Sequence, residues 1–194
     1  YSPAAYLPNR IITGEDLGIG DLRTPTDIFI GKDGKIYILD AGNGRIVVTN
    51  DRWELVRVID GFENNGVPDG FNNPSGIFVT EEGHIYVADT DNNRLVELDP
   101  AGNFLREIGP PESDIIQESF IYQPTKLVVD RAGRIYVVAR HMNQGLIELT
   151  PDGLFRSYMG ATRVAWNPVD YFWKMIATRE QRERMALFVP TEYN

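Results

Sequence analysis

The sequence has no cysteine, only two histidines, no run of about 18 apolar residues and no methionine at its first position. Without cysteine it can form neither a disulfide framework nor a cysteine-based metal site, although this does not fix the compartment. Without a long apolar run it predicts no transmembrane helix. Because the chain starts at Tyr1, we expect that upstream residues were removed by processing or by design of the expressed segment.

Positive charge is also scarce. The 19 Lys and Arg face 28 Asp and Glu, which gives a formal charge of −9. Binding to nucleic acid relies on Lys and Arg that replace counterions along the phosphates, so this charge argues against a nucleic-acid partner. It also disfavours an anionic membrane surface. The 194 residues, 42% of them hydrophobic, suffice for one domain or slightly more with a buried core.

Common catalytic motifs are missing too. The sequence contains no His-Glu-x-x-His zinc motif, no Gly-x-Ser-x-Gly and no glycine-rich phosphate loop. These motifs therefore assign no catalytic residue and no metal ligand.

The strongest pattern present is an internal repeat. Three segments begin at Pro25, Pro74 and Pro124, and in each of them a glycine and an Ile-Tyr pair recur at the same place. The prolines are spaced by 49 and then 50 residues, as are Gly34, Gly83 and Gly133 and also Tyr37, Tyr86 and Tyr136. Such a period indicates a repeat architecture and has to be settled before local structure.

Each repeat reads as four short strands separated by turns. The apolar runs 28–30, 77–79 and 127–129 predict first strands buried on both faces. A pair ending in glycine then predicts a hairpin turn. The Ile-Tyr strand follows, and third and fourth strands are expected at 45–48 and 55–59, at 94–98 and 104–108, and around 155–158. Four antiparallel strands per ~50 residues form the blade of a β-propeller.

The pattern Pro-x-Gly-Ile-x-Val, Gly-x-Ile-Tyr-Val-Ala-Asp and Asn-x-Arg-Leu, clearest between Pro74 and Leu95, resembles the NHL repeat. The resemblance extends from about Thr24 to Gly160. It implies a propeller fold, but not a reaction, because such propellers include binding modules, extracellular sensors and, in related propellers, lactonases and lyases.

We accordingly predict an all-β fold, a partial β-propeller of three four-stranded NHL-like blades with a C-terminal helical insert. The expected order is an entry segment or preceding strand in 1–24, with a strand near 10–13; blades at 25–73, 74–123 and 124–165; a helix in 166–188; and the start of a fourth repeat in 189–194. Asn167 and Pro168 suit the start of that helix. Closed propellers have 4–8 blades, so we expect completion by further blades of a longer chain or, less favoured, by a homodimer.

Two recurring loops, Asp40–Arg45 and Asp89–Arg94, are rich in Asp and Asn, whose side-chain oxygens can coordinate Ca²⁺. Asx turns and Asp–Arg pairing explain the same residues, and we favour this structural interpretation. The third repeat departs from the pattern: Ala139 replaces the aspartate and one residue is inserted. Since function is often grafted onto such loops, our candidate ligand-binding residues are Arg140, His141, Asn143, Gln144, Asp91 and Asn92.

Several features remain open. His141 is also a candidate base or metal ligand, whereas His84 stands where other repeats have Lys35 and Arg134 and is expected on an exposed face. The connections 63–70 and 110–119 are expected to be solvated turns on one propeller face, where they could form a recognition surface.

The sequence thus favours a non-enzymatic binding or scaffolding module for a protein, peptide or glycan, extracellular or at the cell surface of a bacterium. No cofactor is expected, with Ca²⁺ as a minor possibility. The alternative is part of a metal-dependent propeller hydrolase or lyase whose site is completed by other blades.

Overall fold

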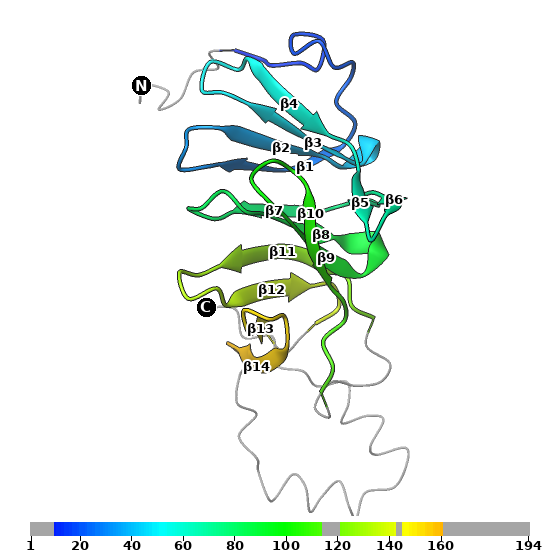
Figure 1. The fold of residues 1–194 in the computed structure, drawn as a ribbon, viewed down its shortest axis with the longest axis vertical. Coiled ribbons are helices and arrows are strands. Elements are labelled where there is room, and N and C mark those ends of the chain that lie inside the picture. The colour runs from blue at the N-terminus through cyan, green and yellow to red at the C-terminus, as the bar shows by residue number, and fades with distance from the viewer. Residues whose placement is uncertain (1–9, 114–120, 143–144, 161–194) are drawn as a thin grey trace, which may run out of the picture. The chain divides into compact units, whose positions relative to one another are not determined.

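The computed structural model of the chain describes residues 10–113, 121–142 and 145–160, which form three four-stranded antiparallel sheets and one hairpin (Figure 1). Blade 1 consists of β1 (Pro25–Ile30), β2 (Ile36–Asp40), β3 (Arg45–Thr49) and β4 (Leu55–Ile59). Blade 2 consists of β7 (Gly76–Val79), β8 (Ile85–Asp89), β9 (Arg94–Leu98) and β10 (Phe104–Ile108). Blade 3 consists of β11 (Pro124–Val129), β12 (Ile135–Ala139), β13 (Leu146–Leu149) and β14 (Phe155–Met159).

Strand order within each blade follows the chain, so neighbouring strands are joined by hairpins. Gly34, Gly83 and Gly133 close the first turn of their blades with φ of 78°, 89° and 76°, a conformation that side chains with a Cβ rarely adopt. These first turns point to one end of the blades, which we call the turn end. The short 3₁₀ helices η1 (Ala41–Asn43) and η2 (Thr90–Asn92) lie at the other, the loop end (Figure 1). For the residues that the structure describes, the predicted all-β architecture of three blades is confirmed.

Blade 2 is buried on both faces. Ile77 and Val79 pack in a core shared with blade 1, whereas Tyr86, Ala88 and Leu95 belong to a second core shared with blade 3. The approach is closest at Gly76, where an added Cβ would lie 2.5 Å from the carbonyl oxygen of Thr125. This glycine is therefore required for the inner strands of blades 2 and 3 to meet.

The prediction that every first strand is buried on both faces is wrong for two of the three. In β7, Ile77 and Val79 are buried, but Ile28 and Ile30 of β1 are 54% and 69% exposed and Val128 of β11 is 51% exposed. The reason is position: β7 lies between β1 and β11 and contacts both. Within the described residues, β1 and β11 each have an inner strand on only one side.

Residues 10–13 were expected to form a strand, and this is wrong as well. Thr13 instead starts a turn in which its backbone N–H donates to Asp16 Oδ2 at 2.8 Å. Leu17 then packs with Ile36, Ile38 and Val47 on the face of blade 1 that lies away from blade 2.

The predicted helix in 166–188 and fourth repeat in 189–194 lie outside the described residues. The part of the chain that the structure describes contains no helix with the length and hydropathy of a membrane span.

Candidate binding surface at the loop end

A buried aspartate ends the second strand of blades 1 and 2. Asp89 is fully buried: its Oδ1 accepts the backbone N–H of Asn72 at 2.7 Å, and its Oδ2 accepts from Asn92 and Arg94, each at 2.9 Å. Asp40 is bound in the same way. Both carboxylates are thus occupied by the protein's own donors, and they tie the incoming chain to the end of the strand. The Asp–Arg pairing that the sequence predicts for the two loops is present in both blades.

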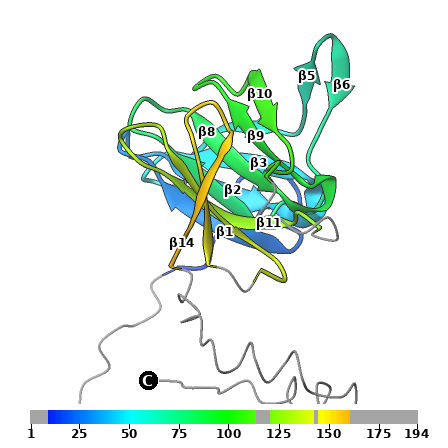
Figure 2. The same cartoon turned by 90° about the horizontal axis from the view of Figure 1, so that it is seen from below.

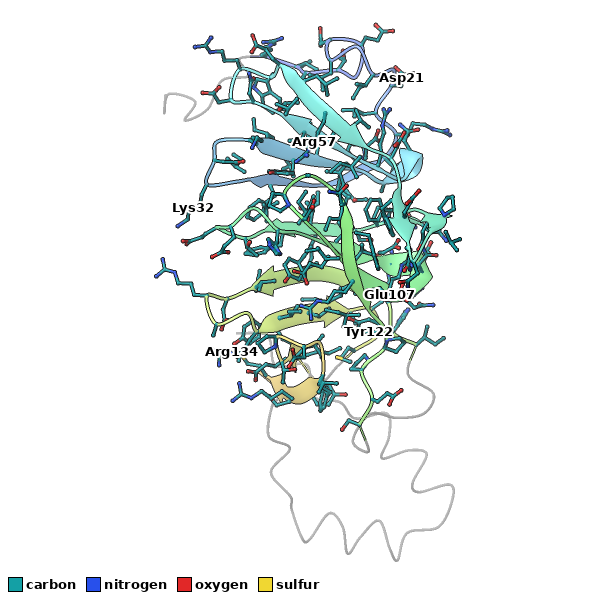
Figure 3. All side chains as sticks on the ribbon, viewed as in Figure 1. Asp21, Lys32, Arg57, Glu107, Tyr122 and Arg134 are labelled. Atoms are coloured by element: carbon teal, nitrogen blue, oxygen red, sulfur yellow. The ribbon has the colours of Figure 1, made fainter. Side chains whose placement is uncertain are left out.

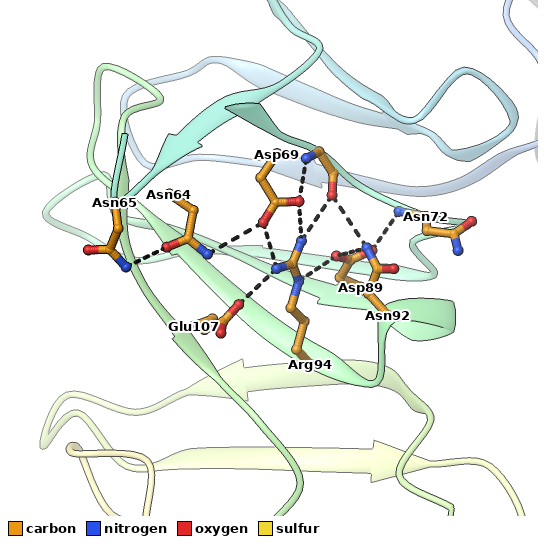
Figure 4. Close-up of polar contacts among 9 residues, drawn as sticks. Asn64, Asn65, Asp69, Asn72, Asp89, Asn92, Arg94 and Glu107 are labelled. Carbon is orange, nitrogen blue, oxygen red and sulfur yellow. Dashed lines mark hydrogen bonds and ion pairs between the residues drawn. The ribbon is translucent and has the colours of Figure 1, made fainter. Parts of the chain in front are cut away.

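Arg94 goes beyond this shared arrangement (Figure 4). Its Nη1 and Nη2 bind Asp69 at 2.7 and 2.9 Å, Nη1 also binds Glu107 at 2.8 Å, and Nη2 donates to the carbonyl of Gly70 at 3.0 Å. The equivalent Arg45 donates to backbone carbonyls instead. Bidentate arginine–carboxylate pairs are strong and fix geometry. Arg94 therefore joins three carboxylates from different segments.

The electrostatic consequences agree with this geometry. The hydrogen bonds from Arg94 lower the pKa of Asp69 to about 2, against the opposing effect of partial burial. The pKa of Arg94 is raised, mainly by its hydrogen bonds to Asp69. Both groups therefore stay charged at neutral pH, and the contact persists as an ion pair.

Asp69 belongs to a hairpin between blades 1 and 2, formed by β5 (Phe62–Asn64) and β6 (Val67–Asp69). Its two-residue turn is Asn65-Gly66, with φ of 53° and 80°, as a type I′ turn requires. Phe62 anchors the base, since its ring stacks on Phe104 with the centroids 5.3 Å apart, and Arg94 lies over the Phe62 ring at 5.7 Å. The hairpin projects from the blades (Figure 2).

The tip of this hairpin is open to solvent. Glu63, Asn65, Gly66 and Pro68 are exposed, and Val67 is 63% exposed. At the base, a cavity of about 370 Å³ is lined by Asp69, Asn92, Asn93, Arg94, Glu107, Gly109 and Pro110. The loop end of blade 2 thus combines a projecting tip with a charged recess.

The structure places four of the six predicted site residues. Asn92 lines the recess, and Asp91 beside it is exposed and accepts from Asn73 Nδ2 at 3.0 Å. Arg140 and His141 are exposed in the corresponding turn of blade 3, where the Arg140 backbone N–H donates to the carbonyl of Gln123 at 2.8 Å.

Asn143 and Gln144 lie outside the described residues. The two pairs occupy the same end of neighbouring blades, with no hydrogen bond or ion pair between them in the described segments. Their role in binding stays a prediction.

Sequence reasoning missed the hairpin and its anchor, because residues 63–70 were taken for a solvated turn. A signal was available: Asn-Gly between short strand-forming segments is the strongest local indication of a hairpin. The pairing of Asp69 with Arg94 had no such signal, since it joins residues from different repeats.

Within residues 10–113, 121–142 and 145–160, no three His, Asp or Glu gather closely enough to hold a metal ion. The Ca²⁺ possibility raised by the sequence stays untested.

Comparison with known proteins identifies the repeat. Residues 71–98 match the NHL repeat family, and no curated protein matches the chain. Among solved structures, hydrazine synthase from Kuenenia stuttgartiensis is similar with a TM-score of 0.54 and 13% identity over 80% of this chain and 40% of that one. A putative exported protein from Bacteroides fragilis gives a TM-score of 0.53 and 15% identity over 73% and 39%.

A virginiamycin B lyase from Staphylococcus aureus gives a TM-score of 0.44 and 15% identity over 71% of this chain and 41% of that one. The chain spans about two fifths of the length of these proteins. At such identities the likeness concerns the fold alone, and the predicted resemblance to NHL-repeat propellers is confirmed.

Proposed function

We propose that this β-propeller chain, whose second blade carries an NHL repeat, is a binding and scaffolding module that holds a peptide segment of a partner protein at the loop end of blade 2. The observation that carries the proposal is the β5–β6 hairpin, whose base is fixed through Asp69 and Arg94 and whose tip is exposed. A preorganised element loses little conformational entropy on binding, so its contacts translate into affinity.

The charge around the hairpin indicates what the partner carries. Arg94 is fully paired with carboxylates of the chain itself, whereas further acidic side chains on this part of blade 2 and its connections are exposed: Asp60, Glu63, Asp91 and Glu112. An acidic surface attracts a segment with Lys or Arg and accelerates its association. Val67 and Pro68 at the tip add an apolar contact. We therefore infer a basic peptide segment in preference to a glycan.

Selection of peptides from a displayed random library tests this function. The chain would be immobilised and selected peptides titrated against it and against a tip variant, Glu63→Ala with Val67→Ala, which keeps the Asn65-Gly66 turn. A matched control, Glu54→Ala with Leu55→Ala, changes an exposed acid and an exposed apolar residue at the far end of blade 1.

We expect basic peptides whose affinity falls about tenfold or more in the tip variant, equivalent to ~1.4 kcal/mol, and is unchanged in the control. Peptides that bind both variants like the unmodified chain would contradict the proposal. So would a glycan array that yields ligands where the peptide library yields none.

The enzyme alternative predicts a different result. A hydrolase or lyase part would carry stoichiometric Ca²⁺ or Zn²⁺ when the full-length protein is purified without chelator, and elemental analysis measures this. We further propose a location outside the cell, supported by the acidic charge and by the use of NHL propellers as extracellular sensors. Cell fractionation with an antibody against the chain tests it.

A further inference from the structure

A second and larger cavity, of about 730 Å³, opens at the turn end, on the opposite side of the blades from the hairpin. Residues from the inner strands and first turns of all three blades line it, among them Phe29, Lys32, Phe78, His84, Val129 and Arg131. Cavities of 300–1,000 Å³ with an apolar lining and a few polar groups are typical of small-molecule sites. The chemistry of the lining indicates which molecule fits.

The floor of the cavity is aromatic and apolar. Phe29 and Phe78 meet edge to face with their centroids 5.1 Å apart, and both rings are only partly buried by the protein. Ile30, 69% exposed, and Val129 continue the apolar lining. An aromatic ring gains both burial and edge or stacking contacts on such a floor.

The rim carries charges of both signs on the first turns of the three blades. Lys32 and Arg131 both contact Glu81, at 2.6 and 3.5 Å, and the three residues occupy equivalent places in their repeats (Figure 3 labels Lys32). Glu82, also exposed on the rim, has no ion-pair partner among the described residues.

The two other carboxylates in the lining, Glu97 and Asp130, are neutralised by arginines at 2.5 and 2.6 Å. The rim is thus balanced, with two cations facing two carboxylates. This balance suits a zwitterion better than an ion of either sign.

His84 supplies a polar ring. Its Nδ1 lies 2.9 Å from Oε1 of the buried Glu97, whose Oε2 binds Arg106 Nε at 2.5 Å. Burial opposes the charge on Glu97, but hydrogen bonds from His84, Arg106 and Tyr86 outweigh it, so the pKa of Glu97 lies below its usual value. An ionised Glu97 makes Nδ1 the donor. The nitrogen left for a ligand is Nε2, which can form a hydrogen bond with a hydroxyl group.

Blade 3 shows that the fold does not need a histidine here. The equivalent residue is Arg134, labelled in Figure 3, and the equivalent carboxylate Glu148 is buried, 3.7 Å from Arg134 and 3.0 Å from Arg156. An arginine can therefore occupy this position near the buried carboxylate in place of a histidine. The expectation that His84 lies on an exposed face is met in part: its side chain is 39% exposed, and it contacts the buried Glu97 while lining the cavity.

We propose that the turn-end cavity binds a free aromatic amino acid with a ring hydroxyl. The ring lies on Phe29 and Phe78, the carboxylate meets Lys32 and Arg131, and the ammonium meets Glu82. The hydroxyl forms a hydrogen bond with Nε2 of His84. This site is independent of the peptide surface at the loop end, and neither proposal depends on the other.

The test uses three probes that differ by one group each: L-tyrosine, L-phenylalanine without the hydroxyl, and tyramine without the carboxylate. Calorimetry and ligand-observed NMR would be run on the full chain, on His84→Arg, and on Lys32→Ala with Arg131→Ala. His84→Arg is a matched variant because blade 3 carries arginine at this position, and thermal unfolding verifies that it folds.

We expect L-tyrosine to bind most tightly. His84→Arg should weaken L-tyrosine about tenfold and leave L-phenylalanine unchanged, because only the hydroxyl contact is lost. The double variant should weaken both amino acids and leave tyramine unchanged. Absence of L-tyrosine binding at millimolar concentration, or equal binding to a folded His84→Arg variant, overturns the proposal.

Discussion

Blades 2 and 3 share a strand pattern and a hydrophobic core, but they differ in the polar residues at their loop ends and turn ends. At the loop end, blade 2 has the buried Asp89 with Asn92 and Arg94, whereas blade 3 has Ala139 at the place of the aspartate. At the turn end, blade 2 has His84 where blade 3 has Arg134. The strands therefore depend on the apolar repeat, while the polar residues at the ends differ from blade to blade.

Polar contacts that recur between blades are structural. Asp89 and Asp40 make the same contacts in two blades, and those contacts tie the chain together. The additional contacts of Arg94 with Asp69 and Glu107 occur in blade 2, next to the hairpin. The contacts that blades 1 and 2 share are structural. We propose a function for the hairpin that the additional contacts of Arg94 hold in place.

The largest effect is expected at Asp89. Asp89→Ala would leave the Asn72 N–H without its acceptor and remove one of three carboxylates from Arg94, so the free energy of unfolding should fall by about 3–5 kcal/mol. Urea unfolding measures this. The converse change, Ala139→Asp in blade 3, buries a carboxylate in a repeat that has Gly145 in place of the arginine, so it should also destabilise the fold. An Asp89→Ala variant as stable as the unmodified chain would contradict the structural role assigned to Asp89.

A somewhat smaller effect is expected where blades 2 and 3 approach each other. Gly76→Ala places a Cβ 2.5 Å from the Thr125 carbonyl oxygen, and the backbone must move, at a cost of about 3 kcal/mol. Gly109→Ala is the control, because an added Cβ there meets no atom within 4 Å. Thermal unfolding of the two variants should differ clearly. Equal melting temperatures would mean that the inner strands are not packed this closely.

Arg94→Lys should release the hairpin while keeping the blade. Lysine cannot form the bidentate contact with Asp69, and we expect a loss of about 1.5 kcal/mol. Amide exchange of residues 62–69 should accelerate strongly, while that of β8 changes little. Uniform acceleration over blade 2 would indicate that Arg94 holds the whole blade instead.

The ion pair also predicts a pH dependence. The pKa of Asp69 is about 2 in the folded chain, below its usual value of 3.8, so its ionised form stabilises the fold above about pH 4. This stabilisation should decline as the pH falls from 4 to 2. In Asp69→Asn this part of the acid dependence should disappear. An unchanged acid titration would show that Asp69 is not paired in solution.

The smallest effect is expected on the rim of the turn-end cavity. Lys32 and Glu81 form an exposed ion pair, and such pairs contribute little because water and salt screen them. Lys32→Ala should therefore leave the melting temperature unchanged while it weakens binding of L-tyrosine. A clear drop in melting temperature would assign Lys32 a structural role.

The fold followed from the sequence because repeated apolar residues dictate it. Ile-Tyr at the second strand and glycine in the first turn have local physical causes, and they recur in register. The exposure of Ile28 and Ile30 did not follow, because it depends on which blade has neighbours on both sides.

The candidate sites were less accessible to sequence reasoning. The sequence predicted that Arg94 pairs with the aspartate of its own loop. Its contacts with Asp69 and Glu107 were not predicted, because they join segments that the repeat does not relate. His84 likewise meets Glu97 across two strands. The contacts of Arg94 have no counterpart in the other repeats, and the partner of His84 lies on another strand, so both emerge only from the packed structure.

The β5–β6 hairpin as binding surface is tested most directly by amide exchange of the chain with and without a selected basic peptide. We expect protection at residues 62–69 and at the neighbouring loop end of blade 2, with no change in the turns at 31–35, 80–84 and 130–134. Protection confined to those turns, or none at the hairpin, would contradict the assignment of the β5–β6 hairpin as the binding surface.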